Sequence, residues 1–188
     1  MTAILRHWRT DDAVALGRIF ERADDALLSN IPDDRSVGGA RSWIETIIGA
    51  EAEGEVCALA IVDQADSSDH RILGNVMASG IEHRHSTAWI SYWATAEARG
   101  QGMTSAGLRS LVDHLHDELG IYRLELGYRV NNPASAAVAQ NAGFLVEGRE
   151  RQKLLYDRIR YDTEVCARLR GDPRAEGPRL PHLPLQTT

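Results

Sequence analysis

Residues 99–104, which read Arg-Gly-Gln-Gly-Met-Thr, have the types and spacing of an anion-binding turn. They follow an apolar, strand-like run at 89–94 and precede a segment with the spacing of an amphipathic helix. Glycine permits close backbone approach and positive φ, and the first N–H groups of a helix point at whatever lies before it. The turn therefore predicts a cradle for a phosphate or diphosphate, with an ordinary glycine turn as the alternative.

A second polar group follows at 130–135, which reads Val-Asn-Asn-Pro-Ala-Ser. Asn132 is suited to cap a helix and Pro133 to its first position, while Gly143 is suited to end it in the left-handed conformation. Ser135 then lies in the first helical turn. Gly-Phe at 143–144 and Glu-Gly at 147–148 follow directly.

Strands and helices must bring these two groups together. The predicted strand at 87–94 leads into the cradle, and 122–130 alternates as a second strand. The helix after the cradle carries its apolar residues on one stripe, namely Leu108, Leu111, Val112, Leu115 and Leu119. The other predicted elements are a strand at 5–8, a helix capped by Thr10 and reaching Leu27, a loop at 30–39, a helix at 40–52, strands at 56–62 and 72–81 around a hairpin loop at 63–70, and two strands within 144–169 joined near 156–158.

Composition indicates one α/β domain over residues 1–170 and a proline-containing tail over 171–188 that is extended or mobile by itself. A formal charge of −6 argues against a nucleic-acid partner, and no apolar run is long enough for a membrane partner. Cys57 and Cys166 fit no metal spacing, so we expect buried thiols, no metal and a cytoplasmic location.

In order and spacing, the two motifs resemble the GNAT acyltransferase superfamily, and within it the Rim-type branch that acetylates ribosomal-protein N-termini. The resemblance covers Ile90 to Leu169 well and the first half only in the order of its elements. It implies an α/β (α+β) fold with a twisted mixed sheet, splayed between its central strands at 87–94 and 122–130, and helices on both faces. Acetyl-CoA is the implied co-substrate, and Rim-type relatives are often dimers, which makes a homodimer the implied assembly.

The resemblance also implies roles for individual residues. The diphosphate is held by main-chain N–H groups at Gly100, Gly102, Met103 and Thr104. Arg99 either adds charge to the phosphates or is a solvated loop residue, and Thr104 or Ser105 either donates a hydroxyl or caps the helix. The strand edge at Tyr92, Trp93 and Ala94 pairs with the pantetheine amides. Asn132 binds the pantetheine arm, Ser135 lies beside the sulfur, and Asn141 contacts the adenosine side or the helix end.

For catalysis, Ser135 is the predicted acid that protonates the departing thiolate, with a purely structural serine as the alternative. Many relatives use a tyrosine where this chain has Ala139. The glutamate base of certain relatives aligns with Leu154, so the base is sought elsewhere. Glu82 and His83 are the leading candidates, and the others are His85, Glu150 and Tyr128.

The predicted function is direct, acetyl-CoA-dependent acetylation of an amine, either a protein N-terminus or a small molecule. Acids such as Asp24 and Asp25 attract a cationic acceptor or are simply solvated. The alternatives are a non-catalytic acyl-CoA sensor and a transferase of another acyl group such as succinyl.

Overall fold

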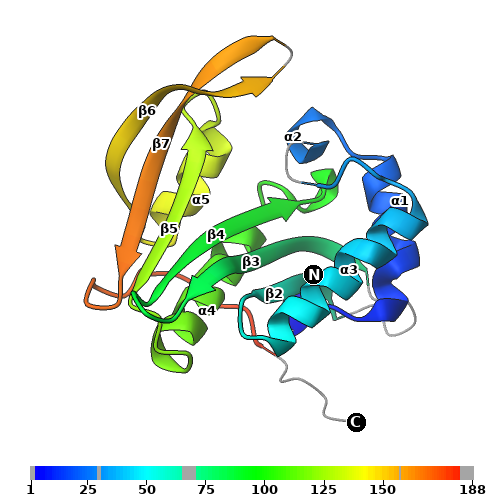
Figure 1. Ribbon diagram of the computed structural model, residues 1–188, viewed down its shortest axis with the longest axis horizontal. Coiled ribbons are helices and arrows are strands. Elements are labelled where there is room, and N and C mark those ends of the chain that lie inside the picture. Colours follow the sequence, from blue (N-terminus) through cyan, green and yellow to red (C-terminus); the bar gives the residue numbers. More distant parts are fainter. Residues whose placement is uncertain (1–2, 29–30, 65–70, 157, 183–188) are drawn as a thin grey trace.

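Seven strands form one mixed sheet in the order β1-β2-β3-β4-β5-β7-β6 (Figure 1). The computed structural model describes residues 3–28, 31–64, 71–156 and 158–182. Parts of the predicted loops at 30–39, 63–70 and 156–158 lie outside these ranges, as does the end of the tail. The elements are β1 (Ala3–His7), η1 (Thr10–Asp12), α1 (Ala13–Glu21), α2 (Asp25–Leu28), α3 (Val37–Ala52), β2 (Cys57–Asp63), β3 (Ile72–Glu82), β4 (Thr87–Ala94), η2 (Ala96–Ala98), α4 (Met103–Asp117), β5 (Arg123–Arg129), α5 (Pro133–Asn141), β6 (Leu145–Tyr156) and β7 (Ile159–Leu169).

The sheet opens between its two central strands. β4 and β5 are parallel and pair only over 87–89 with 123–125, whereas β4 stays paired with β3 as far as Ala94. Beyond Trp89 the two strands diverge, as Figure 1 shows. The predicted splayed sheet is therefore confirmed, and the opening lies beside the end of the strand that leads into the cradle.

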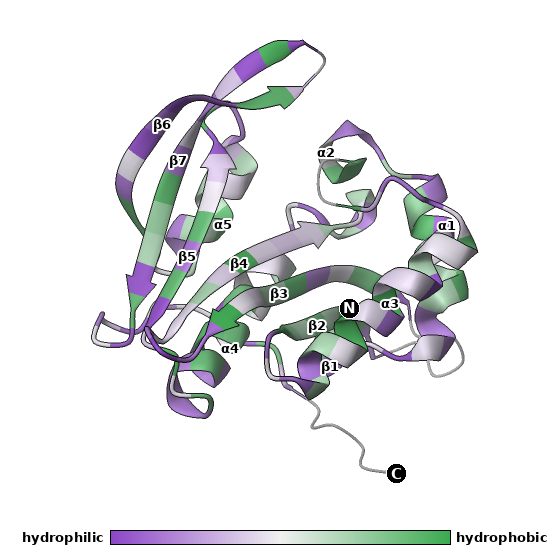
Figure 2. Ribbon diagram, in the orientation of Figure 1, coloured by the Kyte–Doolittle hydropathy of each residue, from purple (hydrophilic) through white to green (hydrophobic). Residues whose placement is uncertain are grey.

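Helices cover both faces of the sheet and bury two separate cores. α4 and α5 pack with the core that contains Leu108, Leu124 and Phe144, and α1 and α3 pack with the core that contains Phe20 and Ile44. All seven residues of β2 are buried, since the strand has helices on both sides, and it is apolar along most of its length in Figure 2. Within the described residues, no helix has the length and apolarity needed to cross a membrane.

The first helical region differs from the predicted single helix. η1 precedes α1, α1 ends at Glu21, and α2 is a separate short helix. The cap is Arg9 rather than Thr10, because the buried Asp12 carboxylate accepts the Arg9 N–H at 2.9 Å and pairs with Arg6. A buried ion pair between the end of β1 and this turn therefore decides how the helix begins.

α3 begins at Val37, three residues before the predicted start. The Ser36 hydroxyl accepts the Gly39 N–H at 3.0 Å and caps the helix. A Cβ at Gly39 would lie 2.2 Å from the Asp34 carbonyl oxygen. The glycine, which the sequence places in a loop, therefore lies in the first turn of the helix and lets the preceding backbone approach closely.

The long β6–β7 hairpin turns where the sequence predicts, with Tyr156 paired to Ile159. Arg158 has φ +65°, which is left-handed backbone. A side chain other than glycine is strained there, because its Cβ crowds the following carbonyl group.

We expect Arg158→Gly to raise the free energy of unfolding by about 1 kcal/mol, since it relieves this strain. Urea unfolding measures the change. Arg160→Gly is the matched control, because Arg160 lies in the regular ladder opposite Leu155 and glycine weakens a strand there. Equal or lower stability of Arg158→Gly than of the unmodified protein would contradict the prediction.

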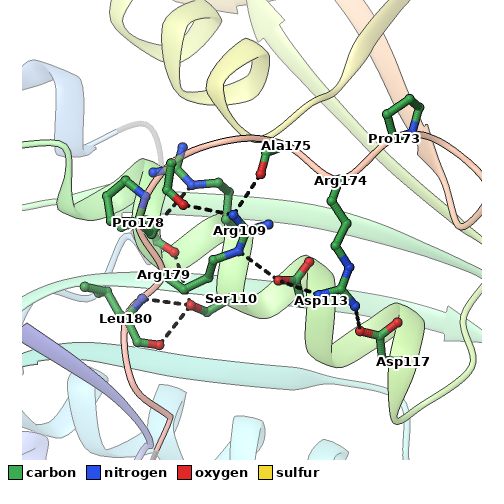
Figure 3. Close-up of polar contacts among 12 residues, drawn as sticks. Arg109, Ser110, Asp113, Asp117, Pro173, Arg174, Ala175, Pro178, Arg179 and Leu180 are labelled. Carbon is green, nitrogen blue, oxygen red and sulfur yellow. Dashed lines mark hydrogen bonds and ion pairs between the residues drawn. The ribbon is translucent and has the colours of Figure 1, made fainter.

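The C-terminal tail is bound to the rest of the domain as far as His182. Figure 3 shows it lying along α4, where Arg179 pairs with Asp113 at 2.9 Å and the Ser110 hydroxyl donates to the Leu180 carbonyl oxygen at 2.9 Å. Its Pro181 carbonyl oxygen accepts the Leu5 N–H at 2.8 Å, next to a parallel bridge between Leu5 and His182. The predicted tail thus has a docked part, and residues 183–188 lie outside the described ranges.

Arg109 connects this docked part to the helices. Its Nε donates to the Pro178 carbonyl oxygen and its Nη1 to that of Asn141, each at 2.9 Å. Arg109 belongs to α4, and Asn141 is the last residue of α5. One buried guanidinium therefore holds the tail, α4 and α5 together.

Two histidines make stability depend on pH. Burial lowers the pKa of both His116 and His182 below the ordinary value of 6.5. The unfolded chain therefore binds more protons than the folded one as pH falls below that value, so folded-state stability is complete above it and decreases beneath it.

We expect the free energy of unfolding to be lower at about pH 5.5 than at about pH 7.5, and the loss to shrink in a His116→Asn/His182→Asn double variant. Urea titrations at both pH values provide the comparison. Asparagine keeps a donor near the Nδ1 position that contacts the Ile121 carbonyl oxygen at 2.8 Å in His116. The same pH dependence in both proteins would show that other groups are responsible.

Candidate active site

A cavity of about 550 Å³ lies between the end of β4, the first turn of α4 and one side of α5 along its whole length. All of the predicted cofactor-binding residues except Met103 line it. The complete lining is Leu27, Tyr92, Trp93, Ala94, Ala98, Arg99, Gly100, Gly102, Thr104, Ser105, Asn132, Ala134, Ser135, Ala137, Val138 and Asn141. Two segments that are distant in the sequence thus form one site.

The cradle has the predicted backbone geometry. Gly100 and Gly102 have φ of +72° and +74°, and a Cβ at either would meet no atom within 4 Å. No side chain caps α4, whose N-cap is Gly102, and the Gly102 carbonyl oxygen accepts the Ala106 N–H at 3.0 Å. The N–H groups at 103–105 come before that first helical hydrogen bond, so they have no partner within the helix and point out of its N-terminal end. This open turn at the positive end of a helix fits a diphosphate.

Met103 contributes differently from its neighbours. Its side chain is buried in the core beneath α4, so only its main chain is available to the cradle. Thr104 and Ser105 also line the cavity, and neither side chain caps the helix.

Arg99 is neither free nor simply solvated. Its two terminal nitrogens contact both carboxylate oxygens of Asp24, and its Nε donates to the Ala94 carbonyl oxygen at 3.2 Å. The Arg99 hydrogen bond lowers the pKa of Asp24. The guanidinium therefore joins the cradle to the segment before α2, a contact between residues 75 positions apart.

The edge of β4 is open toward the cavity. Trp93 and Ala94 pair with β3 on one side, and β5 has diverged on the other. The Trp93 side chain is buried with α1 and α3, so it offers the cavity its main chain. An extended amide-containing chain fits such an edge as an added strand.

The start of α5 closes the cavity opposite β4. Asn132 caps the helix as predicted, its Oδ1 accepting the Ser135 N–H at 3.0 Å. The Tyr92 hydroxyl lies 2.9 Å from both the Ser135 carbonyl oxygen and the Ser135 Oγ, so it can donate its one proton to either. Burial raises the pKa of Tyr92 to about 12. Tyr92 thus presents a protonated hydroxyl as well as its main chain.

Several lining residues escape sequence reasoning. Ala134, Ala137 and Val138 come from α5, where small residues at helical spacing are the signal, and Leu27 comes from α2. Leu27 follows a break between helices that the sequence pattern does not reveal.

The structure does not bring Glu82 and His83 to this cavity. Glu82 pairs with Thr87, at the opposite end of β4 from Ala94, and eight strand residues extend over roughly 20 Å or more. The Glu82 carboxylate accepts the N–H groups of Arg84 and His85, which lower its pKa and give it a turn-stabilising role.

His83 lines a second cavity, of about 570 Å³, at the far end of the sheet. Its other polar lining residues are His7, Glu51, His114, Glu118 and His182. In the part of the chain that the structure describes, no cluster of three or more His, Cys, Asp or Glu residues is placed to hold a metal ion.

The remaining base candidates lie in other contacts. Glu150 pairs with Lys153 at 2.5 Å, and the Tyr128 hydroxyl donates to Glu164 at 2.8 Å. Cys57 and Cys166 are both buried and free, as expected, and neither lines the cavity. Burial raises the pKa of Cys57 to about 12. Among the described residues that line the cavity, Tyr92 and Arg99 are those with ionisable side chains.

The comparison with known proteins agrees with this geometry. Residues 3–145 match the family described as acetyltransferase (GNAT) domain, which is most of the chain. The chain belongs to the GNAT acetyltransferase family.

Curated GNAT relatives include YdaF of Bacillus subtilis, 30% identical over 108 residues, and the ribosomal-protein-serine acetyltransferase of Escherichia coli, 31% identical over 101 residues. The matched segments cover 57% and 54% of this chain. The same segments cover 59% and 56% of the lengths of the two relatives, so this chain matches a little over half of each relative.

Solved GNAT structures share the fold over nearly the whole chain. RimL, a ribosomal L7/L12 α-N-protein acetyltransferase in complex with coenzyme A, is 25% identical with a TM-score of 0.78, covering 90% of this chain and 94% of RimL. The ribosomal-protein-S5-alanine acetyltransferase of Vibrio fischeri has a TM-score of 0.82 at 20% identity, covering 92% and 95%.

Proposed function

We propose that this GNAT protein is an acetyl-CoA-dependent N-acetyltransferase that transfers acetyl directly to an amine within a ternary complex. The observation that carries the proposal is the single cavity in which the glycine cradle, the open β4 edge and Ser135 meet. When bound, acetyl-CoA supplies an activated acetyl thioester.

Each part of the cavity has a role in this reaction. The main-chain N–H groups at 102–105 hold the diphosphate, and the edge of β4 aligns the pantetheine arm. An N–H group of that edge polarises the acetyl carbonyl and stabilises the oxyanion that develops on it. Ser135 gives a proton to the departing sulfur.

We assign the acceptance of the amine proton to water in the cavity. No carboxylate or imidazole belongs to its described lining, so solvent is the available route. Neither cysteine lines the cavity, so no thiol is placed there to carry the acetyl group as a covalent enzyme intermediate, which favours direct attack.

We propose a protein N-terminal amine as the acceptor. The names of the Escherichia coli relative and of RimL support this, since both are ribosomal-protein acetyltransferases. The same relatives support a cytoplasmic location, where ribosomal proteins occur, and a homodimer stays a prediction for light scattering to test. A small amine is the second acceptor class.

The test is thiol release from acetyl-CoA in the presence of an amine panel. The panel contains peptides with ribosomal-protein N-termini, a polyamine and an aminoglycoside, each with a matched acetylated control peptide or amine. Thiol release with a peptide, together with acetylation of its N-terminus by mass spectrometry, supports the proposal. Release only with a small amine changes the acceptor class, and coenzyme A binding without release for any amine overturns the enzymatic function.

The absence of a carboxylate or imidazole from the described lining favours one alternative, an acyl-CoA sensor that binds without catalysis. The panel separates the two functions, because a sensor binds acetyl-CoA and releases no thiol. Succinyl-CoA in parallel assays tests the acyl group, since the cradle contacts phosphate and not the acyl chain.

A further inference from the structure

Tyr92 joins the two sides of the opening in the sheet. The β4–β5 ladder ends at Trp89 with Glu125, three residues before Tyr92. At Tyr92 the strands no longer pair, and its hydroxyl reaches the first turn of α5, which follows β5 in the chain. This side chain therefore makes a direct polar contact between β4, on one side of the opening, and α5, the helix that follows β5 on the other side.

Ser135 is held at all three of its polar groups. Asn132 accepts its N–H at 3.0 Å, and the Tyr92 hydroxyl lies 2.9 Å from both its carbonyl oxygen and its Oγ. A phenol has one proton to donate. When Tyr92 donates it to the Oγ, the Ser135 proton is free to point into the cavity, and when Tyr92 donates it to the carbonyl oxygen, Ser135 donates to Tyr92 instead.

The surroundings keep Tyr92 a donor. Its ring packs against the core beneath α4 and α5, and its hydroxyl lies on the wall of the cavity. Burial raises the pKa of Tyr92 to about 12, so the phenol stays protonated at neutral pH. Arg99, which also lines the cavity, is engaged by Asp24.

We propose that Tyr92 is the positioning residue that aims the Ser135 proton at the sulfur of the bound thioester, an inference that rests on the proposed function. Ser135 gives this proton to sulfur as the carbon–sulfur bond breaks and its electron pair goes to sulfur. The new bond joins the acceptor nitrogen to the acetyl carbon. The proton lost by that nitrogen restores the Ser135 hydroxyl through water, so the products are one amide and one thiol.

This role accounts for a departure from the family pattern. Ala139, the α5 position at which the resemblance implies a tyrosine in many relatives, is buried in the core here. Tyr92 brings a phenol to Ser135 from the opposite side of the opening, on a strand rather than on α5. The phenol in this chain acts through the serine instead of replacing it.

The test is a double-mutant cycle between Tyr92→Phe and Ser135→Ala. Phenylalanine keeps the ring and removes only the hydroxyl. We expect each variant to lower kcat by about 100-fold or more, because proton transfer by a positioned side chain typically contributes about 10²- to 10⁴-fold. The Kd of acetyl-CoA, measured by calorimetry, should stay within about twofold of its original value, since the cradle is untouched.

The double variant distinguishes positioning from independent roles. We expect it to lose no more activity than Ser135→Ala alone, because Tyr92 acts only through that serine. Tyr122→Phe is the matched control, since Tyr122 is exposed and lies outside the cavity. Losses that multiply in the double variant, or an unchanged kcat in Tyr92→Phe, would overturn the inference.

The experiment also separates this inference from the proposed function. If no amine accelerates thiol release, the slow hydrolysis of acetyl-CoA by water is followed instead, since it needs the same proton on sulfur. Failure of every amine contradicts the transferase function. Equal hydrolysis rates in the original protein and Tyr92→Phe contradict the positioning role of Tyr92.

Discussion

Gly102→Glu is expected to weaken acetyl-CoA binding by about 100-fold or more while the protein stays folded. The carboxylate would enter the space where main-chain N–H groups are proposed to hold two phosphates. Like charges about 4 Å apart repel by roughly 1 kcal/mol in water and by about 4 kcal/mol near a protein surface. A loss of about 2.8 kcal/mol corresponds to 100-fold in Kd. Calorimetric titration with acetyl-CoA measures the change.

Gly80→Glu is the matched control for this variant. Gly80 also has positive φ, +56°, and a Cβ there meets nothing within 4 Å, so it carries the same backbone strain and the same added charge. It lies near the far end of β3, away from the cavity. Equal affinity of the two variants for acetyl-CoA would show that the cradle does not hold the diphosphate.

Asp12→Ala has the largest expected effect on stability. Arg6 and Asp12 form a two-pronged ion pair, with distances of 2.7 and 2.6 Å, and their side chains are 3% and 1% exposed. Removal of the carboxylate leaves a buried guanidinium without its partner and frees the Arg9 N–H. Breaking such a pair typically costs about 3–5 kcal/mol of unfolding free energy. Urea unfolding tests the prediction.

Asp11→Ala provides the comparison, because Asp11 is the exposed neighbour in the same turn. We expect it to change stability by less than about 0.5 kcal/mol, as surface substitutions usually do. An Arg6→Met/Asp12→Leu double variant should recover much of the loss, since apolar replacement of both partners leaves no unpaired charge. Similar stabilities for Asp11→Ala and Asp12→Ala would contradict the structural role of the pair.

In the proposed function, cofactor binding and proton donation depend on different parts of the cavity. We propose that main-chain groups of α4 hold the diphosphate end of the cofactor, whereas β4 and α5 meet at Ser135 through the Tyr92 side chain. Arg109 fastens the two helices to each other and to the docked tail at the far side. Binding and proton donation therefore rest on different contacts, which is why the proposed variants should affect Kd and kcat separately.

The features that the sequence alone determines are those made by neighbours in the chain. The glycine turn at 100–102 and the Asn132–Pro133 cap depend on backbone dihedral angles and on hydrogen bonds that span a few residues. Their residue types leave few other conformations. The succession of strands and helices along the chain, and the pattern of alternation along β5, follow from apolar periodicity in the same way.

Tertiary structure alone decided which distant groups meet. Tyr92 and Ser135 are 43 positions apart, Arg99 and Asp24 are 75 apart, and Ser110 and Leu180 are 70 apart. Glu82 and His83 are the opposite case, because they are close to β4 in the sequence but lie far from the cavity. They lie at the Thr87 end of β4, whereas the cavity lies at its Ala94 end. Such contacts depend on where β4 and β5 diverge and on how α2 and the tail fold back. Periodicity within one element carries no information about either, because many long-range arrangements bury the same apolar faces.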